Sequence, residues 1–259
     1  MNRFLVDSDG TNISCADLGG AGRCAVLLHG LYGGLHEWYE TAAWLKASHH
    51  VFAIDQRGHG QSAKRLKDFS LEAFARDACA VIEYLQYPVL LIGQSMGALN
   101  ALLLAAQRPD LVESLVLIEA HAYNDSGQVQ DWLSSWPLPF ANLGAAQRYF
   151  ENQEMNAAAW VQVLEQRDGA YWPQFNSEDM RAIAIELSYY DFRDECRRIS
   201  APTLVIAGSK SWLDRRGTKD MAALIPNSLY AEIAGASHDV HLDAPEAFRS
   251  TVAAWLSQF

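Results

Sequence analysis

Runs of hydrophobic residues of strand length alternate with amphipathic helical stretches along most of this chain of 259 residues. Parallel strands need a crossover helix between them, so this alternation predicts an α/β fold in which helices flank a mostly parallel central sheet. After a hairpin of residues 3–6 and 11–18, we expect strands at 24–29, 51–55, 89–93, 114–119, 203–207 and 228–233. The expected helices are 36–47, 70–86, 96–107, 218–224 and 245–257.

The alternation stops between residues 120 and 200, a stretch that is rich in aromatic residues and shows only helical patterning. An insertion of this size is much longer than the usual connection between a strand and a helix. We expect a helical cap at 121–200, inserted after the sixth strand. The cap would divide one α/β core into a first part at 1–120 and a second part at 201–259.

The composition excludes several classes of protein. Half of the residues are hydrophobic and a fifth are charged, which predicts a sizeable buried core rather than a disordered chain. The formal net charge of −11 argues against nucleic acid as a partner, because phosphate binding needs a concentrated basic face. Residues 84–107 carry no charge and are long enough to span a bilayer, but Pro88, Gly93 and Asn100 interrupt them. We expect a buried strand followed by a buried helix there, and no membrane anchor.

Two further features bear on the cellular compartment. The first ten residues lack the long apolar stretch of a signal peptide. The four cysteines lie far apart, without a C-x-x-C pair or a Cys/His spacing that suits a metal. We therefore expect a cytoplasmic protein with reduced thiols, no metal and no cofactor.

Gly93-Gln94-Ser95-Met96-Gly97 fits the pattern G-x-S-x-G and lies between a predicted strand and a predicted helix. This context is typical of a nucleophile elbow, a sharp strand-to-helix turn that exposes a serine hydroxyl. The turn is so tight that side chains two positions before and after the serine would collide, which accounts for both glycines. The free N–H groups and the dipole at the helix N-terminus would stabilise negative charge there. The simpler interpretation, that Ser95 only caps an ordinary helix, fits these flanking elements less well.

Three further segments, together with this turn, make the sequence similar to the α/β-hydrolase superfamily over nearly the whole chain. His29-Gly30 resembles the oxyanion-loop signature of the family, and residues 55–62 (DQRGHGQS) resemble its D-x-R-G-H-G-x-S turn. Residues 235–246 (GASHDVHLDAPE) resemble the loop that carries the catalytic histidine. The resemblance implies an α/β-hydrolase fold and a serine hydrolase with a Ser-His-acid triad. A serine at the nucleophile position excludes the dehalogenase and epoxide-hydrolase chemistries of this fold, which attack with a carboxylate.

The serine needs a base within hydrogen-bond reach, because a hydroxyl is a poor nucleophile at neutral pH. Of the eight histidines, His238 is the candidate, since it lies in a Gly/Ala/Ser turn between the last strand and the terminal helix. It also satisfies the order serine, acid, histidine along the chain. We expect His59 and His241 to be hydrogen-bonded loop residues instead.

The acid of the triad is the open question. In most of the family it lies about three residues past the glycine that ends the seventh strand, and here that position is Ser211, which has no charge. Glu119 ends the sixth strand, and the sequence resembles members of the superfamily, including small acyl esterases, whose acid lies there. We favour Glu119, because a strand end fixes a side chain better than a loop does. Asp214 is the alternative, although it could equally cap a helix or pair with a neighbouring arginine.

The oxyanion hole should consist of two backbone N–H groups. Leu31, which follows His29-Gly30, and Met96, which follows the nucleophile, are the candidates. The loop glycines Gly33 and Gly34, with Gly30, would then allow a close approach to the serine.

Aromatic side chains indicate what such a site would accept. The candidates for contact with the substrate are Tyr32, Trp132, Trp136, Trp160 and Trp212. As a set they predict an apolar or aromatic portion of the substrate, although any one of them is first of all a core residue. We expect a carboxylesterase-like hydrolase that cleaves an ester or a lactone through an acyl-enzyme on Ser95. An acyl thioesterase and a non-catalytic small-molecule receptor with a damaged triad are the alternatives.

Overall fold

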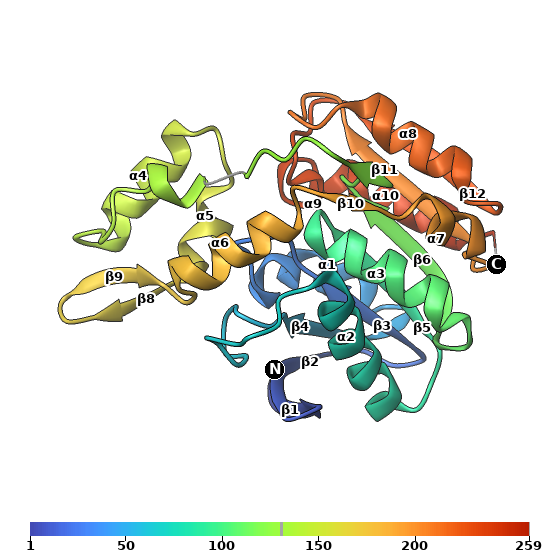
Figure 1. Cartoon of the computed structure of the whole chain (residues 1–259), viewed down its shortest axis with the longest axis horizontal. Helices are drawn as coiled ribbons and strands as arrows, with labels where there is room; N and C mark the ends of the chain where they lie inside the picture. The colour runs from blue at the N-terminus through green and yellow to red at the C-terminus, as the bar shows by residue number, and fades with distance from the viewer. Residues whose placement is uncertain (130–131, 259) are drawn as a thin grey trace.

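The computed structural model describes residues 1–129 and 132–258. Its central element is a sheet of eight strands in the order β1-β2-β4-β3-β5-β6-β11-β12 (Figure 1). The strand β2 runs antiparallel to β1 and β4, and the other pairs are parallel. The predicted α/β architecture with a mostly parallel sheet is therefore confirmed. In chain order the strands are β1 (Asn2–Ser8), β2 (Thr11–Gly19), β3 (Arg23–Leu28), β4 (His49–Asp55), β5 (Val89–Gln94), β6 (Val112–Ile118), β11 (Thr203–Gly208) and β12 (Ser228–Ile233).

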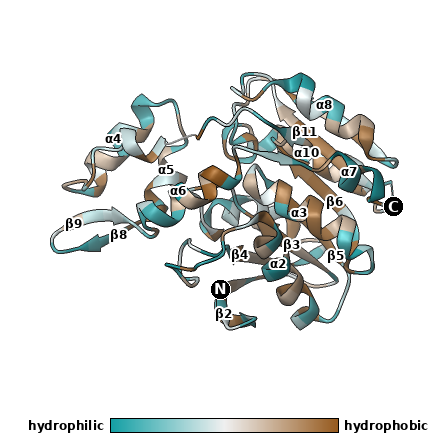
Figure 2. Cartoon of the chain, viewed as in Figure 1, coloured by the Kyte–Doolittle hydropathy of each residue, from teal (hydrophilic) through white to brown (hydrophobic). Residues whose placement is uncertain are grey.

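Helices cover both faces of this sheet. The helices α1 (Tyr39–Leu45) and α10 (Pro245–Leu256) pack on one face. The helices α2 (Leu71–Leu85), α3 (Met96–Gln107) and α8 (Arg215–Leu224) pack on the other. Figure 2 shows that central strands such as β6 and β11 are predominantly hydrophobic, whereas the outer helices mix hydrophobic and hydrophilic residues. This distribution is what a sheet buried between two helical layers requires.

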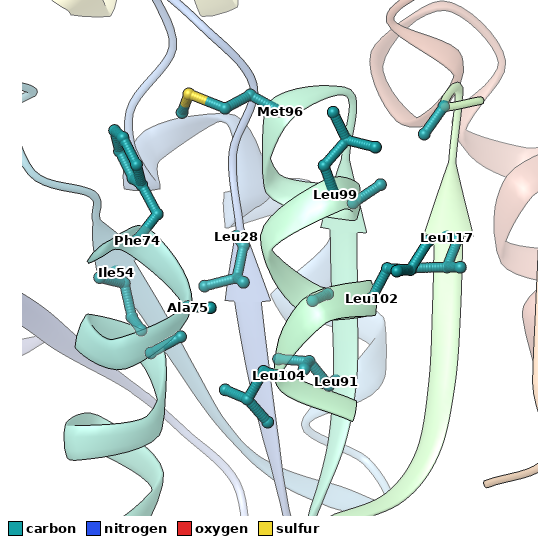
Figure 3. Packing of buried hydrophobic residues seen from close by; sticks show 14 of the residues in the cluster. Leu28, Ile54, Phe74, Ala75, Leu91, Met96, Leu99, Leu102, Leu104 and Leu117 are labelled. Atoms are coloured by element: carbon teal, nitrogen blue, oxygen red, sulfur yellow. The ribbon is translucent and has the colours of Figure 1, made fainter. Parts of the chain in front are cut away.

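The side chains of each central strand divide between the two faces. In β6, Leu115 and Leu117 belong to the core on the α3 side, and Val116 and Ile118 belong to the core on the α10 side. Figure 3 shows the first of these cores, in which Leu117 lies beside α3. Because both faces are buried, such strands read as continuous hydrophobic runs, and this is why the sequence pattern predicts them well.

Between β6 and β11 the chain leaves the sheet. Figure 1 shows α4 (Leu143–Asn152) and α5 (Ala157–Trp160) to one side of the core, with α6 (Ser177–Glu186) leading back to it. The helix α7 (Arg193–Arg198) falls within the range 121–200 that we expected to be a cap, but it packs against α3 and α8 of the core.

The expectation that the inserted segment contains only helices is wrong. The strands β8 (Leu164–Arg167) and β9 (Ala170–Pro173) form a hairpin, and β7 (Tyr123–Asn124) pairs with β10 (Tyr190–Asp191). The turn of the hairpin is Asp168-Gly169, with φ of 51° and 80°. Two residues of positive φ match the twist of a hairpin, and Asp-Gly is a preferred sequence for such a turn. Strands of four and two residues are too short to show a clear alternation in the sequence.

The uncharged residues 84–107 form the end of α2, the buried strand β5 and the buried helix α3, as the sequence predicts. Within the two ranges that the structure describes, every helix is too short or too polar to cross a membrane.

Candidate active site

Ser95 lies on the sharp turn between β5 and α3. Its backbone has φ 53° and ψ −118°, a strained conformation for a residue that carries a side chain. A Cβ on Gly93 would lie 2.2 Å from the Gly97 carbonyl oxygen, and a Cβ on Gly97 would lie 2.3 Å from the Leu28 carbonyl oxygen. Close backbone contacts therefore require both glycines, as expected for a nucleophile elbow.

Glu119 and His238 meet at the edge of the sheet formed by the carboxyl ends of the parallel strands. Glu119 directly follows β6, and His238 lies in the loop after β12. The distance from Nδ1 of His238 to Oε2 of Glu119 is 3.0 Å, and the Glu119 side chain is only 1% exposed. Because a carboxylate only accepts hydrogen bonds, Nδ1 must carry the proton, which leaves the lone pair of the neutral ring on Nε2.

Further hydrogen bonds fix Glu119 against β11. Its own N–H donates to the Ile206 carbonyl over 2.9 Å. The N–H of Gly208 donates to Oε1 over 2.6 Å, and the hydroxyl of Ser211 donates to Oε2. The carboxylate is therefore held on both oxygens, as a residue that orients an imidazole must be.

Asp214, the alternative acid, is engaged elsewhere. It is the N-cap of α8, and its Oδ1 accepts from the Arg216 N–H over 3.0 Å. This cap starts α8 at Arg215 rather than at residue 218, where the sequence pattern placed the start. No hydrogen bond joins Asp214 to His238 in the part of the chain that the structure describes. The geometry therefore favours Glu119 as the partner of His238.

Two contacts bring the His238 loop and Glu119 to the turn at Ser95. The side-chain amide of Gln94 donates to the His238 carbonyl oxygen over 3.1 Å. The N–H of Ser95 donates to the carbonyl oxygen of Ile118, the residue before Glu119, over 2.8 Å. The sequence gives no signal for this role of Gln94, because the residue occupies a variable position of the G-x-S-x-G pattern.

The Ser95 hydroxyl and the His238 ring are not hydrogen-bonded to each other in the described residues. The two residues are linked instead through the contacts of Gln94 with His238 and of Ser95 with Ile118.

The predicted oxyanion loop, residues 29–34, runs beside Ser95. A Cβ on Gly30 would lie 3.4 Å from the Ser95 Cβ and 2.2 Å from Oε1 of Gln94. A side chain at this position would therefore displace the Gln94 amide, which the glycine leaves in place.

The two predicted oxyanion donors lie on this loop and at the start of α3. Met96 is the first residue of α3 (Figure 3), so its N–H has no partner within the helix. In the loop, the N–H of Tyr32 binds Nε2 of His59 over 3.2 Å, and the N–H of Gly33 binds the Gly30 carbonyl over 3.2 Å. No hydrogen bond of the described residues engages the N–H of Leu31.

His59 anchors the oxyanion loop. Its Nδ1 donates to the Arg57 carbonyl over 2.9 Å, so Nε2 is free to accept from Tyr32. Burial holds the pKa of His59 well below its usual value, which keeps the ring neutral and able to accept. The expectation that His59 is a hydrogen-bonded loop residue is confirmed.

Four of the five aromatic candidates lie in one cluster. The ring centroid of Tyr32 is 5.7 Å from that of Trp132 and 6.5 Å from that of Trp136. The centroid of Trp160 is 5.0 Å from that of Trp132. This aromatic cluster joins the oxyanion loop to the segment inserted between β6 and β11.

Trp212 lies apart from the aromatic cluster, on the loop after β11. Its side chain is 67% exposed, and its ring centroid is 4.7 Å from that of His238. On the other side, the indole N–H of Trp160 donates to Oδ2 of Asp239, the residue after His238, over 2.9 Å. Tryptophans thus contact the His238 loop from two different elements.

The expectation for His241 is wrong, because this residue lies in the short helix α9 (Val240–Asp243) and neither of its ring nitrogens has a hydrogen-bond partner among the residues that the structure describes. Its ring is stacked on that of Trp38, with centroids 4.3 Å apart. Burial lowers the pKa of His241 to about 4 and raises that of Glu37 to about 7. Between these pH values both groups are uncharged, so their 3.5 Å contact is not an ion pair.

No group of His, Cys, Asp and Glu side chains in the described residues is arranged to hold a metal ion.

Comparison with known proteins identifies the family. A family model described as "alpha/beta hydrolase fold" matches residues 26–245. The chain belongs to this family. It is 26% identical over 258 residues to 3-oxoadipate enol-lactonase 2 of Acinetobacter baylyi, covering 95% of this chain and 94% of the relative. It is 24% identical over 249 residues to sn-1-specific diacylglycerol lipase ABHD11 of Mus musculus, covering 90% of this chain and 80% of the relative.

Solved structures agree with this membership at the level of the fold. The structure of E-2-(acetamidomethylene)succinate hydrolase superposes on this α/β-hydrolase with a TM-score of 0.91 at 24% identity, covering 99% of both chains. The α/β-hydrolase fold that the sequence implies is therefore confirmed.

Proposed function

We propose that this α/β-hydrolase is a serine hydrolase that cleaves a carboxylic ester or a lactone through an acyl-enzyme on Ser95. The observation that supports this most is the hydrogen bond between His238 and Glu119, at the end of the sheet where the Ser95 turn lies. This bond gives the imidazole the tautomer and the orientation of a general base. The names of two similar proteins, a lactonase and a lipase, agree with this chemistry.

In the acylation step, the Ser95 oxygen attacks the carbonyl carbon of the substrate while Nε2 of His238 takes the hydroxyl proton. The carboxylate of Glu119 stabilises the imidazolium that forms. The N–H groups of Leu31 and Met96 donate to the oxyanion of the tetrahedral intermediate, and a donor of this kind contributes about 10²- to 10³-fold to kcat.

The first tetrahedral intermediate collapses when its carbon–oxygen bond to the alcohol breaks. His238 gives its proton to the leaving alcohol, or to the alcohol end of an opened lactone, and the acyl-enzyme remains. In the deacylation step, a water molecule gives a proton to Nε2 of the neutral His238 and attacks the acyl carbon. When the second tetrahedral intermediate collapses, its bond to the Ser95 oxygen breaks, the acid leaves, and His238 returns the proton to Ser95.

The substrate carries an apolar or aromatic portion. The part of the inserted segment that precedes α7 acts as a cap. Its Trp132 and Trp136 contact Tyr32 of the oxyanion loop, and its Trp160 packs on Trp132 in the aromatic cluster. Together with Trp212 beside His238, this cluster would surround a bound substrate with aromatic surface.

The test is covalent labelling of the full chain with a fluorophosphonate probe, followed by intact-mass and peptide analysis. We expect one adduct, on Ser95, and none on the Ser95→Ala variant. We also expect a burst of about one equivalent of nitrophenol from p-nitrophenyl acetate, since an acyl-enzyme accumulates.

Two outcomes would contradict the proposal. A folded chain that is not labelled and turns over no ester, lactone or thioester would support the non-catalytic receptor. Labelling of Ser95 together with much faster hydrolysis of an acyl thioester than of the matching ester would support the thioesterase.

A further inference from the structure

One loop, residues 208–213, holds both oxygens of the Glu119 carboxylate. The N–H of Gly208 donates to Oε1 over 2.6 Å, and the hydroxyl of Ser211 donates to Oε2. The same Oε2 accepts the bond from Nδ1 of His238 over 3.0 Å. Ser211 and His238 therefore share one oxygen of a carboxylate that is almost completely buried.

The Ser211 hydroxyl has a fixed direction. Its oxygen accepts from the N–H of Leu213 over 3.1 Å, so its single proton is free for Glu119. The loop itself is tied to neighbouring elements, because the N–H of Lys210 donates to the Ala236 carbonyl over 2.9 Å and that of Ser209 to the Ile233 carbonyl over 3.0 Å. The loop that carries the Ser211 hydroxyl is therefore held in place by backbone hydrogen bonds.

We propose that Ser211 is a positioning residue of the hydrolysis described above: its hydroxyl holds Oε2 of Glu119 at Nδ1 of His238. This inference rests on the proposed function. A glutamate side chain has three rotatable bonds, so its strand-end backbone alone does not fix where Oε2 lies. The hydrogen bond from Ser211 restricts the rotation of the Glu119 side chain, and it acts on Oε2, the oxygen that orients His238.

Ser211 also shares the negative charge of Oε2 with His238. When the hydroxyl is removed, more of that charge acts on the imidazole and stabilises its protonated form. Since His238 must be neutral to take the Ser95 proton, the acid limb of the kcat/KM profile should then move to higher pH. Glu37, Tyr230, Asp239 and His241, which interact electrostatically with Glu119 or His238, are unchanged in such a variant.

The test compares Ser211→Ala with Ser211→Thr in the full chain. We expect Ser211→Ala to lower kcat about tenfold with little change in KM, because a hydrogen bond to a charged group is lost and substrate contacts are not. Its acid limb should move to higher pH. Ser211→Thr keeps a hydroxyl and should recover most of kcat and the original limb.

The matched control is Ser228→Ala at the amino end of β12, the end away from His238, where the hydroxyl donates to the Ala222 carbonyl over 2.6 Å. It should leave kcat and the pH profile unchanged. The proposal is overturned if Ser211→Ala matches the wild type in both, or if Ser211→Thr and Ser228→Ala lose as much as Ser211→Ala. If Ser211→Ala does not fold, as judged by thermal melting, Ser211→Cys replaces it, since a thiol is a much weaker donor. Labelling of Ser95 in the wild type decides the proposed function separately.

Discussion

Burial decides the charge of individual residues around the candidate site. Glu37 follows the oxyanion loop and His241 follows His238, and the two side chains are in contact. Burial raises the pKa of Glu37 to about 7 although the nearby N–H groups of Gly30 and Gly34 oppose the rise. Within residues 1–129 and 132–258, one oxygen of Glu37 has no hydrogen-bond partner. A neutral Glu37 is therefore the stable form over part of the pH range in which the protein is folded.

Glu37→Gln should change how stability depends on pH. The folded pKa of Glu37, about 7, lies above its ordinary value of 4.5, so the folded state binds a proton more tightly than the unfolded state does. Stability from this residue is fully present below pH 4.5 and is lost as the pH rises to 7, by about 3 kcal/mol in total. The glutamine variant cannot ionise, so it should lack this loss and be more stable than the wild type at pH 8.

Urea denaturation of both chains between pH 4.5 and 8 measures this effect. His241 acts in the opposite direction on the wild type and the variant alike, because its lowered pKa makes stability rise between pH 4 and 6.5. The difference between the two curves therefore isolates Glu37. If the stability of both chains changed with pH in the same way, Glu37 would already be ionised in the folded state near pH 4.5, and the raised pKa would be contradicted.

At the scale of secondary structure elements, the strand-turn-helix unit of β5 and α3 is the most constrained part of the site. The turn forces Ser95 to a positive φ of 53°, and it leaves no room for a Cβ on either flanking glycine. Both constraints follow from the local pattern G-x-S-x-G, so this element could be predicted from the sequence alone.

Gly93→Ala should disrupt this element. The new Cβ would lie 2.2 Å from a backbone oxygen, which cannot move without displacing the start of α3. We expect a loss of stability of about 2–3 kcal/mol, typical of overpacking, together with a loss of fluorophosphonate labelling at Ser95.

Gly144→Ala in α4 is the matched control. A Cβ there would approach no atom closer than the Asn142 side chain at 3.3 Å, and alanine is the better helix former. Thermal melting should show no loss of stability for this variant. A Gly93→Ala variant that melts and reacts like Gly144→Ala would contradict the close contact at the turn.

At the scale of the whole molecule, a structural feature can be predicted from the sequence when a short, continuous sequence pattern encodes it. The core strands and helices follow from hydrophobic periodicity, and the G-x-S-x-G and His238 segments each carry a local pattern. The choice between Glu119 and Asp214 depends on where β6 and β11 place two loops, which no local pattern encodes. Asp214 is close to Ser211 in sequence, yet it caps α8, whereas Glu119 comes from another strand.

The inserted segment was predicted least well for a related reason. Its hairpin strands are short, and its tryptophans pack on one another and on Tyr32 rather than on the main sheet. Aromatic content alone does not distinguish a helix from a hairpin strand when neither is long enough to show a period. The wrong expectation for His241 has a similar cause, because its stacking on Trp38 depends on tertiary packing.

The comparison of Glu119→Gln with Asp214→Asn tests the central claim most directly, by steady-state hydrolysis of one ester under identical conditions. Both changes keep the shape of the side chain and remove its charge, and asparagine still caps α8. We predict that Glu119→Gln lowers kcat about 10³- to 10⁴-fold and that Asp214→Asn stays within about threefold of the wild type. A large loss in Asp214→Asn with Glu119→Gln nearly as active as the wild type would contradict the assignment of Glu119, and with it the account of the site.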